Sequence, residues 1–384
     1  MGEICKISVS PSFTGIKIRV ITLCAIPLLI SLTAFSQERV RSLRPKYTSE
    51  MTVIGYTGGE TLTNFPVAVR ISPSNIEGFN YNQCKGQSDI VFSDANGMTL
   101  PHEIECWNTN GESVAWVSLP TMTTNNPITF TMNWKLGAEP DSCSTSVWTN
   151  PKYLGVWHMN TPYDATLSAN YQTNSVGTFH AKMIGASPSI VNTGKIGTEL
   201  INKYAKTDFG DILSIPAPLT NGLNQVGFVI SGWSYWQGYN RQGAAYIFSI
   251  STTSTGSYHW RIHVRYNKIA AKFGTDDHIN IGDNKINSGW LNWAVRVKNR
   301  TVYEYFVNGK LLLTVTEDAK HVSLSDGMMV QTGGTSGHSD ELRIHNIAAS
   351  DDWIKAEYDS VSNAKFITAA PAVRRPVPLQ FIIR

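Results

Sequence analysis

Two acidic residues, Glu103 and Glu105, are one position apart in a segment whose composition predicts a strand. Side chains at positions i and i+2 of a strand point to the same face, so these carboxylates would lie a few ångströms apart. Such a pair can supply the acid and the nucleophile of glycoside hydrolysis. The third acid of such a run is missing, because positions 107 and 108 are Trp107 and Asn108. We therefore expect two exposed carboxylates and no catalysis, and the sequence also lacks serine-nucleophile, paired-histidine and phosphate-loop motifs.

A second candidate is the strictly alternating segment 259–266. Period two places His259, Arg261, His263 and Arg265 on one face and apolar side chains on the other. Nitrogen-rich side chains spaced about 7 Å apart could bind an acidic glycan or peptide. The alternative is a solvated outer face. Metal binding by the two histidines is disfavoured, because the neighbouring arginines repel a cation.

A third candidate is the aromatic cluster of Trp233, Tyr235, Trp236 and Tyr239, which Arg241 follows. Aromatic faces stack on sugar rings, and a nearby guanidinium strengthens such a site. Because strand residues alternate between two faces, core packing explains at least one part of the cluster. The cluster therefore predicts either a sugar-binding platform or an aromatic core.

The elements that would position these residues are short strands separated by turns. Charged residues make up only 16% of the chain, and β-branched and aromatic residues are frequent. Asn308-Gly309 is a hairpin signal between the segments 302–307 and 310–316, and a short helix is expected at 351–358. This pattern predicts an all-β chain with two tandem β-sandwich domains.

The first 36 residues have the features of a secretory signal. Lys17 and Arg19 precede an apolar run at 20–35, and a small-x-small exit ends before Gln37. The run is shorter than the roughly 20 residues that span a membrane, although a retained anchor is the alternative. We expect a mature chain that begins at Gln37, has no transmembrane segment, and is exported to the periplasm, the outer cell surface or the medium.

Charge and cysteine content narrow the range of partners. The leader contains three basic residues and one acid, so its removal lowers the net charge from +3 to +1, which attracts no nucleic acid at long range. Cys84, Cys106 and Cys143 would remain, which permits one disulfide and one free thiol after export. The sequence does not determine which two would pair.

Polar, turn-rich segments divide the chain. The expected order is a signal peptide at 1–36, a linker at 37–48, a small β-sandwich at 49–136, a linker at 137–150, a larger sandwich at 151–360 and a C-terminal tail at 361–384. Because 137–150 is polar and carries no strand signal, we expect the two sandwiches to fold separately.

Two ordered sets of motifs carry a family resemblance. The first set is GTEL at 197–200, GDILSIP at 210–216, FVISGW at 228–233, WLNWAV at 290–295, YFVNGK at 305–310 and DELRIHN at 340–346. In this order they resemble the laminin-G-like, concanavalin A-type jelly roll. The second set is LTNFPV at 62–67, SDIVFSD at 88–94, HEIECWN at 102–108 and AWVSLP at 115–120. This set is similar to a bacterial family known as domain of unknown function 2341. The resemblances imply the fold, and they place the two glutamates outside the domain in which glycosidases of this fold carry their acids.

The resemblance to the jelly roll also implies calcium. Asp164 opens the run Asp164-Ala165-Thr166, where the family has an Asp-Ser-Ser-type loop, and Asp340 opens the last strand. Loop carbonyls and one or two carboxylates can hold this ion. Extra residues before His180 depart from the family's loop. The alternative is that both aspartates form turns and caps.

The leading hypothesis is a secreted or cell-surface, non-catalytic binding or adhesion protein that recognises a glycan or another surface protein through the jelly roll. The residues expected to contact the ligand are Trp236, Tyr239, Arg241, His259, Arg261 and His263. The alternatives are a glycoside hydrolase or polysaccharide-processing accessory protein, and a structural part of a surface assembly.

Overall fold

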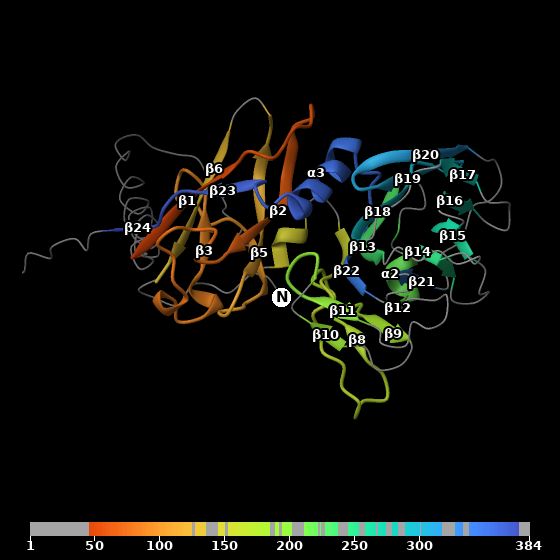
Figure 1. Ribbon diagram of the computed structural model, residues 1–384, viewed down its shortest axis with the longest axis horizontal. Helices are drawn as coiled ribbons and strands as arrows, with labels where there is room; N and C mark the ends of the chain where they lie inside the picture. The colour runs from red at the N-terminus through yellow and green to blue at the C-terminus, as the bar shows by residue number, and fades with distance from the viewer. Residues whose placement is uncertain are drawn as a thin grey trace, which may run out of the picture. The chain divides into compact units, whose positions relative to one another are not determined.

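The computed structural model describes residues 46–124, 127–135, 145–149, 153–184 and 338–375 continuously and, between 185 and 337, mainly the strands. These residues form four sheets arranged as two sandwiches (Figure 1). The predicted fold class, all-β with β-sandwich domains, is confirmed. No helix in the described part of the chain is long and apolar enough to cross a membrane. The predicted leader lies outside the described residues.

The first sandwich packs a five-stranded sheet against a three-stranded one. The larger sheet has the order β23-β1-β6-β3, with β24 also paired to β1, and the smaller has the order β2-β5-β4. The bounds are β1 Tyr47–Val53, β2 Leu62–Ile71, β3 Val91–Ser93, β4 His102–Cys106, β5 Ser113–Met122, β6 Ile128–Trp134, β23 Ile367–Ala369 and β24 Val373–Arg374. Short 3-10 helices are η1 Tyr81–Gln83, η2 Gln87–Asp89 and η3 Thr145–Trp148. Phe92 and Phe130 are buried in its core, with ring centroids 6.1 Å apart.

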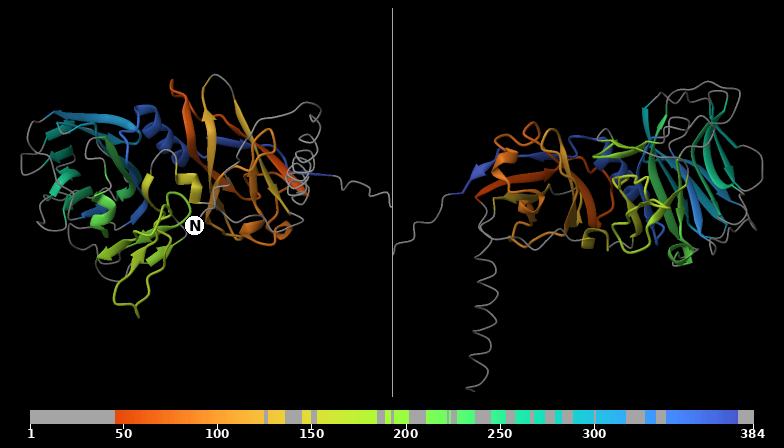
Figure 2. Two further views of the ribbon diagram at one scale, coloured as in Figure 1. Left: turned by 180° about the vertical axis from the view of Figure 1, so that it is seen from behind. Right: turned by 90° about the horizontal axis from the view of Figure 1, so that it is seen from below.

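The far end of the chain completes this first sandwich. After the second sandwich, α3 (Asp351–Ser362) leads back, and β23 pairs antiparallel with β1, with Ala369 opposite Met51. The blue C-terminal strand lies beside the red β1 (Figures 1 and 2). The hydroxyl of Ser360 on α3 accepts a hydrogen bond from the backbone N–H of Ala68 on β2 at 2.9 Å. The segment that the sequence predicted as a tail thus supplies two strands.

The second sandwich packs two eight-stranded sheets. One has the order β10-β11-β22-β13-β18-β19-β20, with β7 paired to β22, and the other has the order β17-β16-β15-β14-β21-β12-β9-β8. The first sheet contains β7 Tyr153–Trp157, β10 Ser189–Val191, β11 Glu199–Ile201, β13 Phe228–Trp236, β18 Gly289–Val297, β19 Val302–Val307, β20 Lys310–Thr316 and β22 His338–His345. The second contains β8 Tyr171–Gln172, β9 Ala181–Ile184, β12 Asp211–Ile215, β14 Ala245–Thr252, β15 Tyr258–Arg265, β16 Lys268–Phe273, β17 Ile279–Gly282 and β21 Met328–Thr332, and α2 (Ala217–Asn221) follows β12. Phe248 and Trp293 stack between the sheets with ring centroids 4.2 Å apart.

Local signals explain where elements begin and turn. Asn308 and Gly309 have φ angles of +51° and +70°, the left-handed conformations that a tight hairpin requires, and β19 and β20 flank them. The helix α3 begins after Ser350, whose hydroxyl accepts a hydrogen bond from Trp353 N at 3.2 Å. The helix runs beyond the predicted end at 358, because its last turn packs against β2.

The sheet that contains β13 and β18 is buried on both faces. Trp293 of β18 points into the second sandwich, whereas its neighbour Ala294 belongs to the core that includes the first sandwich. Trp233 of β13 stacks on Tyr358 of α3, with ring centroids 5.6 Å apart. Side chains therefore alternate as the sequence predicted, but each face meets a different core.

The predicted linker 137–150 contains part of this shared core. Trp148 on η3 is fully buried and packs on Trp116 of β5. Separate folding of the two sandwiches stays a prediction. Cys84 and Cys106 are free thiols, so they do not pair with each other, and Cys143 lies outside the described residues.

Candidate functional site

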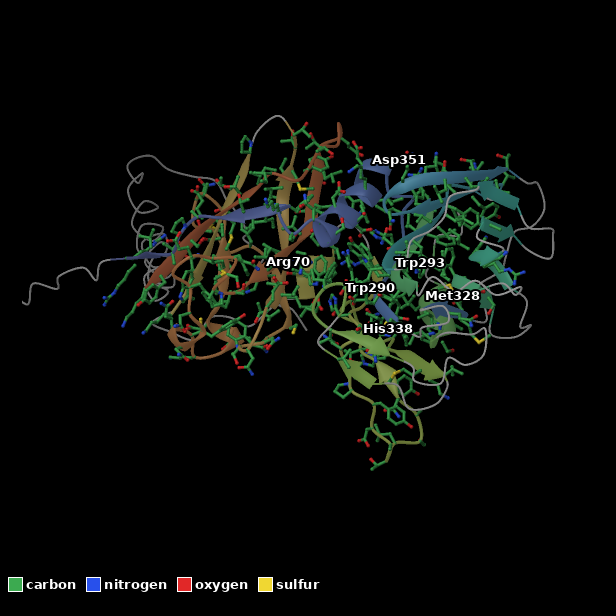
Figure 3. All side chains as sticks on the ribbon, in the orientation of Figure 1. Arg70, Trp290, Trp293, Met328, His338 and Asp351 are labelled. Carbon is green, nitrogen blue, oxygen red and sulfur yellow. The ribbon has the colours of Figure 1, made fainter. Side chains whose placement is uncertain are left out.

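The predicted aromatic platform is in part core packing. Trp233 is 4% exposed and stacks on Tyr358, so it contributes to packing. Tyr235 is half-buried and lies edge-on to Trp290, with ring centroids 5.6 Å apart. Trp290 on β18 and His338 on β22 belong to the same sheet, and their ring centroids are 6.4 Å apart (Figure 3).

The remaining predicted aromatic and basic contacts fall where the structure gives no side chains. Trp236 ends β13 and His259 lies on β15, but the side chains of both are outside the described residues. Tyr239 and Arg241 are outside them entirely. Ligand contacts at these four residues stay predictions.

The prediction of an exposed basic face on this strand is wrong at two positions. Arg261 is 7% exposed and His263 is 0% exposed. Trp260 and Ile262 on the same strand are buried as well, so both faces of β15 are covered at this point. This strand lies between β14 and β16 inside an eight-stranded sheet. Period two assigned the residues to faces, but it does not tell whether a face meets water.

The two predicted calcium ligands lie in different environments. Asp164 is exposed, and its Oδ1 accepts hydrogen bonds from the hydroxyl and the N–H of Thr166, which lower its pKa. Asp340 is 1% exposed and accepts a hydrogen bond from Ile196 N at 3.0 Å. Burial, and then the charge of Glu341, raise the pKa of Asp340 well above its usual range. Asp164 forms a turn, as the alternative predicted, and calcium binding stays a prediction.

A buried charged cluster joins the two sandwiches. Glu103 and Glu105 lie on β4, His158 follows β7, and Glu341 lies on β22. Their side chains are 16%, 0%, 2% and 1% exposed, in that order. The sequence predicted two exposed glutamates, which is wrong, because His158 and its neighbours cover that face of β4.

The imidazole of His158 lies among three carboxylates. Its Nδ1 is hydrogen-bonded to Glu341 Oε1 and lies 3.8 Å from Glu105 Oε2. Its Nε2 lies 3.5 Å from Glu103 Oε2. The cluster thus brings two residues of the first sandwich into direct electrostatic contact with two of the second.

Indole groups hold the two glutamates of β4. Trp116 Nε1 donates a hydrogen bond to Glu105 Oε2 at 2.8 Å, and Trp148 Nε1 donates one to Glu103 Oε2. The other oxygen of Glu105, Oε1, is buried and has no hydrogen-bond partner among the described residues. It lies against Gly197, whose φ is +61° and where a Cβ would come within 2.1 Å of it. Only glycine fits beside this carboxylate.

Burial and mutual interaction determine protonation in the cluster. Burial, followed by the charge of Glu341, raises the pKa of Glu105 to about 8. Burial alone would lower the pKa of His158, but Glu341 and Glu103 outweigh it and hold the pKa well above its usual range. Burial would raise the pKa values of Glu341 and Glu103, but the charge of His158 lowers both. His158 is therefore a cation between two ionised carboxylates.

Arg343 connects this cluster to a second buried group. Its guanidinium donates hydrogen bonds to Glu341 Oε2 at 2.6 Å and to Glu357 Oε1 at 3.3 Å. Glu357 Oε1 also accepts a hydrogen bond from the Tyr153 hydroxyl at 2.6 Å and lies 3.1 Å from His345 Nε2. Burial opposes ionisation of Glu357, but His345 and then Arg343 overcome it and lower the pKa to about 2.

The enclosure of the cluster limits what it can do. The Glu105 side chain is fully buried and that of Glu103 is 16% exposed, so the pair on β4 lacks the open cleft that a glycosidase needs. A metal ion, unlike a polysaccharide, needs no open cleft. Among the described residues, Glu105, His158 and Glu341 form the one group of three or more potential ligands whose donor atoms lie within 4.8 Å of one another. The sequence could not assemble them, because they come from three distant segments.

A polar groove opens on the surface of the first sandwich beside Arg70, which Figure 3 labels. The groove has a volume of about 320 Å³ and lies between β1, β2 and the chain that follows α3. Its polar lining consists of Arg70, Ser74, Asn75, Ser360, Asn363, Lys365 and Thr368. A neighbouring hollow of about 460 Å³ shares Ser74 and Asn75 with the groove and is completed by residues 109–112.

Three planar polar groups lie where the two hollows meet. Arg70 Nη1 donates to Glu112 Oε1 at 2.5 Å, and Asn75 Nδ2 donates to Glu112 Oε2 at 2.7 Å. A third hydrogen bond, from Arg70 Nη2 to the carbonyl of Val361 at 2.9 Å, anchors the guanidinium to α3. The Arg70 and Glu112 side chains remain 19% and 36% exposed. Their remaining hydrogen-bonding capacity is open to a ligand.

Comparison with known proteins identifies no family. No family model matches the chain, and no curated protein matches it in sequence. Among solved structures, it is similar to the binding domain of Paraclostridial Mosquitocidal Protein 1, with a TM-score of 0.40 and 12% identity over 55% of this chain and 52% of that chain. It is also similar to the botulinum neurotoxin serotype D/C VPI 5993 binding domain, with a TM-score of 0.41 and 12% identity over 56% and 53% of the two chains. The chain thus spans about half of these structures, and similarities of this size carry no conclusion about function. The laminin-G-like and 2341-type resemblances stay predictions.

Proposed function

We propose that the chain is an exported, non-catalytic binding protein and that the polar groove beside Arg70 holds a segment of a glycan. The observation that carries this proposal is the anchored array of Arg70, Glu112 and Asn75 between two adjoining hollows. The sequence placed the ligand on the larger sandwich instead. The burial of Arg261 and His263 is the reason for choosing a different surface.

The chemistry of the groove suits sugar hydroxyls. Each hydroxyl is both a donor and an acceptor, and guanidinium, carboxylate and amide groups can each bind two neighbouring hydroxyls at once. The hydrogen bond from Arg70 to Val361 fixes the guanidinium in advance, so little side-chain entropy is lost on binding. Lys365 and Asn363 line the groove beside this array and can contact the same glycan.

The groove predicts weak binding at each site. Phe366 contributes to the lining but is only 1% exposed, so it offers little ring surface for stacking on a sugar. Affinity would rest on hydrogen bonds that replace those to water, and we expect a Kd on the order of 0.1–1 mM. Useful retention at a surface would then come from several copies binding together.

Catalysis is not part of the proposal. A glycosidase places two carboxyl groups on opposite sides of the scissile bond, about 5–9 Å apart. Among the described residues that line the two hollows, Glu112 is the one carboxylate, and it is paired with Arg70. Export rests on the leader at 1–36 alone. A second glycan surface at Trp236 and Tyr239 is retained as a further part of the hypothesis.

A glycan array of the mature chain from Gln37, followed by titration of each hit, tests the proposal. Lys365→Ala and Asn75→Ala should each weaken binding about five- to tenfold, because each removes a donor worth about 1 kcal/mol. Lys46→Ala, an exposed lysine outside the groove, is the matched control and should bind as the wild type does. All three should melt at nearly the same temperature. Full binding in both groove variants, with loss in Trp236→Ala, would move the site to the larger sandwich.

A structural part of a surface assembly is the second candidate function. The shared core between the sandwiches favours it, because a stiff unit transmits position and force. An array without hits, together with concentration-dependent assembly in sedimentation experiments, would support this role over glycan binding. Release of reducing sugar from a polysaccharide panel would contradict both and establish a hydrolase.

A further inference from the structure

Three potential metal ligands from three elements meet in the buried cluster. Glu105 comes from β4 of the first sandwich, His158 follows β7, and Glu341 lies on β22 of the second sandwich. One donor atom of each lies within 4.8 Å of the others, and each side chain is at most 2% exposed. Donor atoms bound to one ion at about 2.0–2.2 Å lie roughly 3–4 Å from one another. Small side-chain adjustments would therefore bring all three onto one cation.

The carboxylate of Glu105 gives an independent indication that it binds something. Its Oε1 is buried without a hydrogen-bond partner in the described part of the chain, while its Oε2 accepts a hydrogen bond from Trp116. The same carboxyl group lies 3.8 Å from the Nδ1 of His158. A buried carboxylate oxygen without a partner is destabilising, and a cation on that carboxyl group would remove the penalty.

The charges around the cluster favour a cation over an anion. Glu103, Glu105 and Glu341 contribute three negative charges when ionised, and Arg343, hydrogen-bonded to Glu341, contributes one positive charge. Imidazole binds metal in its neutral form, so His158 as a ligand would add no charge. With His158 neutral, the carboxylates outnumber Arg343 around the site, and this excess of negative charge attracts a cation.

We infer that Glu105, His158 and Glu341 bind one divalent transition-metal ion, such as Zn²⁺ or Mn²⁺, that links the two sandwiches. A mixed set of one imidazole and two carboxylates suits these ions. Calcium takes six to eight oxygen ligands, which this set does not provide. Because the ligands are enclosed and come from both sandwiches, the ion is taken up during folding and exchanges slowly afterwards.

Metal analysis of the tag-free mature chain tests this inference. Protein produced in medium with Zn²⁺ and Mn²⁺ should contain about one equivalent of metal per chain. Unfolding with chelator and refolding without metal should lower the melting temperature, and Zn²⁺ or Mn²⁺, but not Ca²⁺, present during refolding should restore it. Refolding with Co²⁺ should give the visible absorption of a nitrogen- and oxygen-ligated cobalt ion.

Variants separate this site from adventitious binding. Glu105→Gln keeps the size of the side chain and an acceptor for Trp116, and its metal content should fall below about a tenth of an equivalent. Glu77→Gln, at an exposed glutamate, should keep the full equivalent. If Glu105→Gln does not fold, the metal content and the cobalt spectrum of the wild type decide. A wild type with less than about a tenth of an equivalent, both as purified and after refolding with metal, overturns the inference. Full retention of metal in a folded Glu105→Gln variant overturns it as well.

Discussion

The carboxylate of Glu357 provides a quantitative test of the buried network. Its Oε1 accepts a hydrogen bond from Tyr153 and lies within hydrogen-bonding distance of Arg343 and His345. Glu357→Gln keeps the size of the side chain but removes the negative charge. We expect this variant to fold with lower stability at neutral pH, because the guanidinium of Arg343 loses the counter-charge to which it donates a hydrogen bond.

The size and sign of the pH effect follow from the pKa. A decrease from 4.5 in a free glutamate to about 2 in the folded protein corresponds to about 3 kcal/mol of stability. Because the folded-state pKa is the lower one, this stabilisation is complete above about pH 5 and disappears as the pH falls towards 2. Between pH 7 and pH 3.5 the wild type should lose about 1.4 kcal/mol, a tenfold change in the unfolding constant, through this one group.

Urea unfolding at pH 7, 5 and 3.5 measures the effect. The difference in unfolding free energy between wild type and Glu357→Gln should narrow by about 1.4 kcal/mol over this range. Glu77→Gln, at an exposed glutamate, is the matched control and should differ little from wild type at any pH. A gap that stays constant with pH, or one below about 0.5 kcal/mol at pH 7, would refute the reasoning that the network holds this charge.

Three further predictions concern the chain ends and the aromatic core. Deletion of residues 363–384 removes β23 and β24 from β1, so urea melts should show that the free energy of unfolding falls by several kcal/mol. Gel filtration should show association of chains through the open edge of the sheet, whereas an unaltered melt would contradict the pairing. Trp233→Ala should cost about 3–5 kcal/mol in urea melts, because the indole is buried against Tyr358, while glycan binding by the folded protein stays at the wild-type level. Intact mass of the exported protein should match a chain that begins at Gln37, and a species that keeps residues 20–35 would contradict cleavage there.

Elements with local signals could be predicted from the sequence. The hairpin around Asn308 and Gly309 is specified by two adjacent residues that tolerate positive φ, and its strands have the predicted bounds. The start of α3 is equally local, because Ser350 caps it. Its last turn was missed, because Ser360 is held in the helix by contact with β2, almost three hundred positions earlier in the chain.

The sequence did not reveal which faces of the strands are buried. The burial of these faces determines which candidate sites are open to a ligand. Alternation shows that Glu103 and Glu105 share a face, but the groups that cover it, His158 and Glu341, follow much later in the sequence. The polar groove was missed for the same reason. One wall of the groove carries Arg70. The other carries Lys365, which lies in a segment with the composition of a tail, and this segment forms a wall only when β23 pairs with β1.

The buried charges at the junction of the sandwiches also determine how α3 docks on the strands. Removing an ion from water costs several kcal/mol, and attraction in the interior offsets this only where the geometry is good. Arg343 has such geometry, because Glu341 from its own strand and Glu357 from α3 both accept its hydrogen bonds. A shifted docking of the helix would leave a charge buried without its partner, at a cost of about 3–5 kcal/mol. The rings of Trp116 and Trp148, 4.3 and 5.2 Å from the guanidinium carbon, tolerate small shifts far better. Aromatic packing therefore permits several arrangements, and the charges exclude those in which they are not matched.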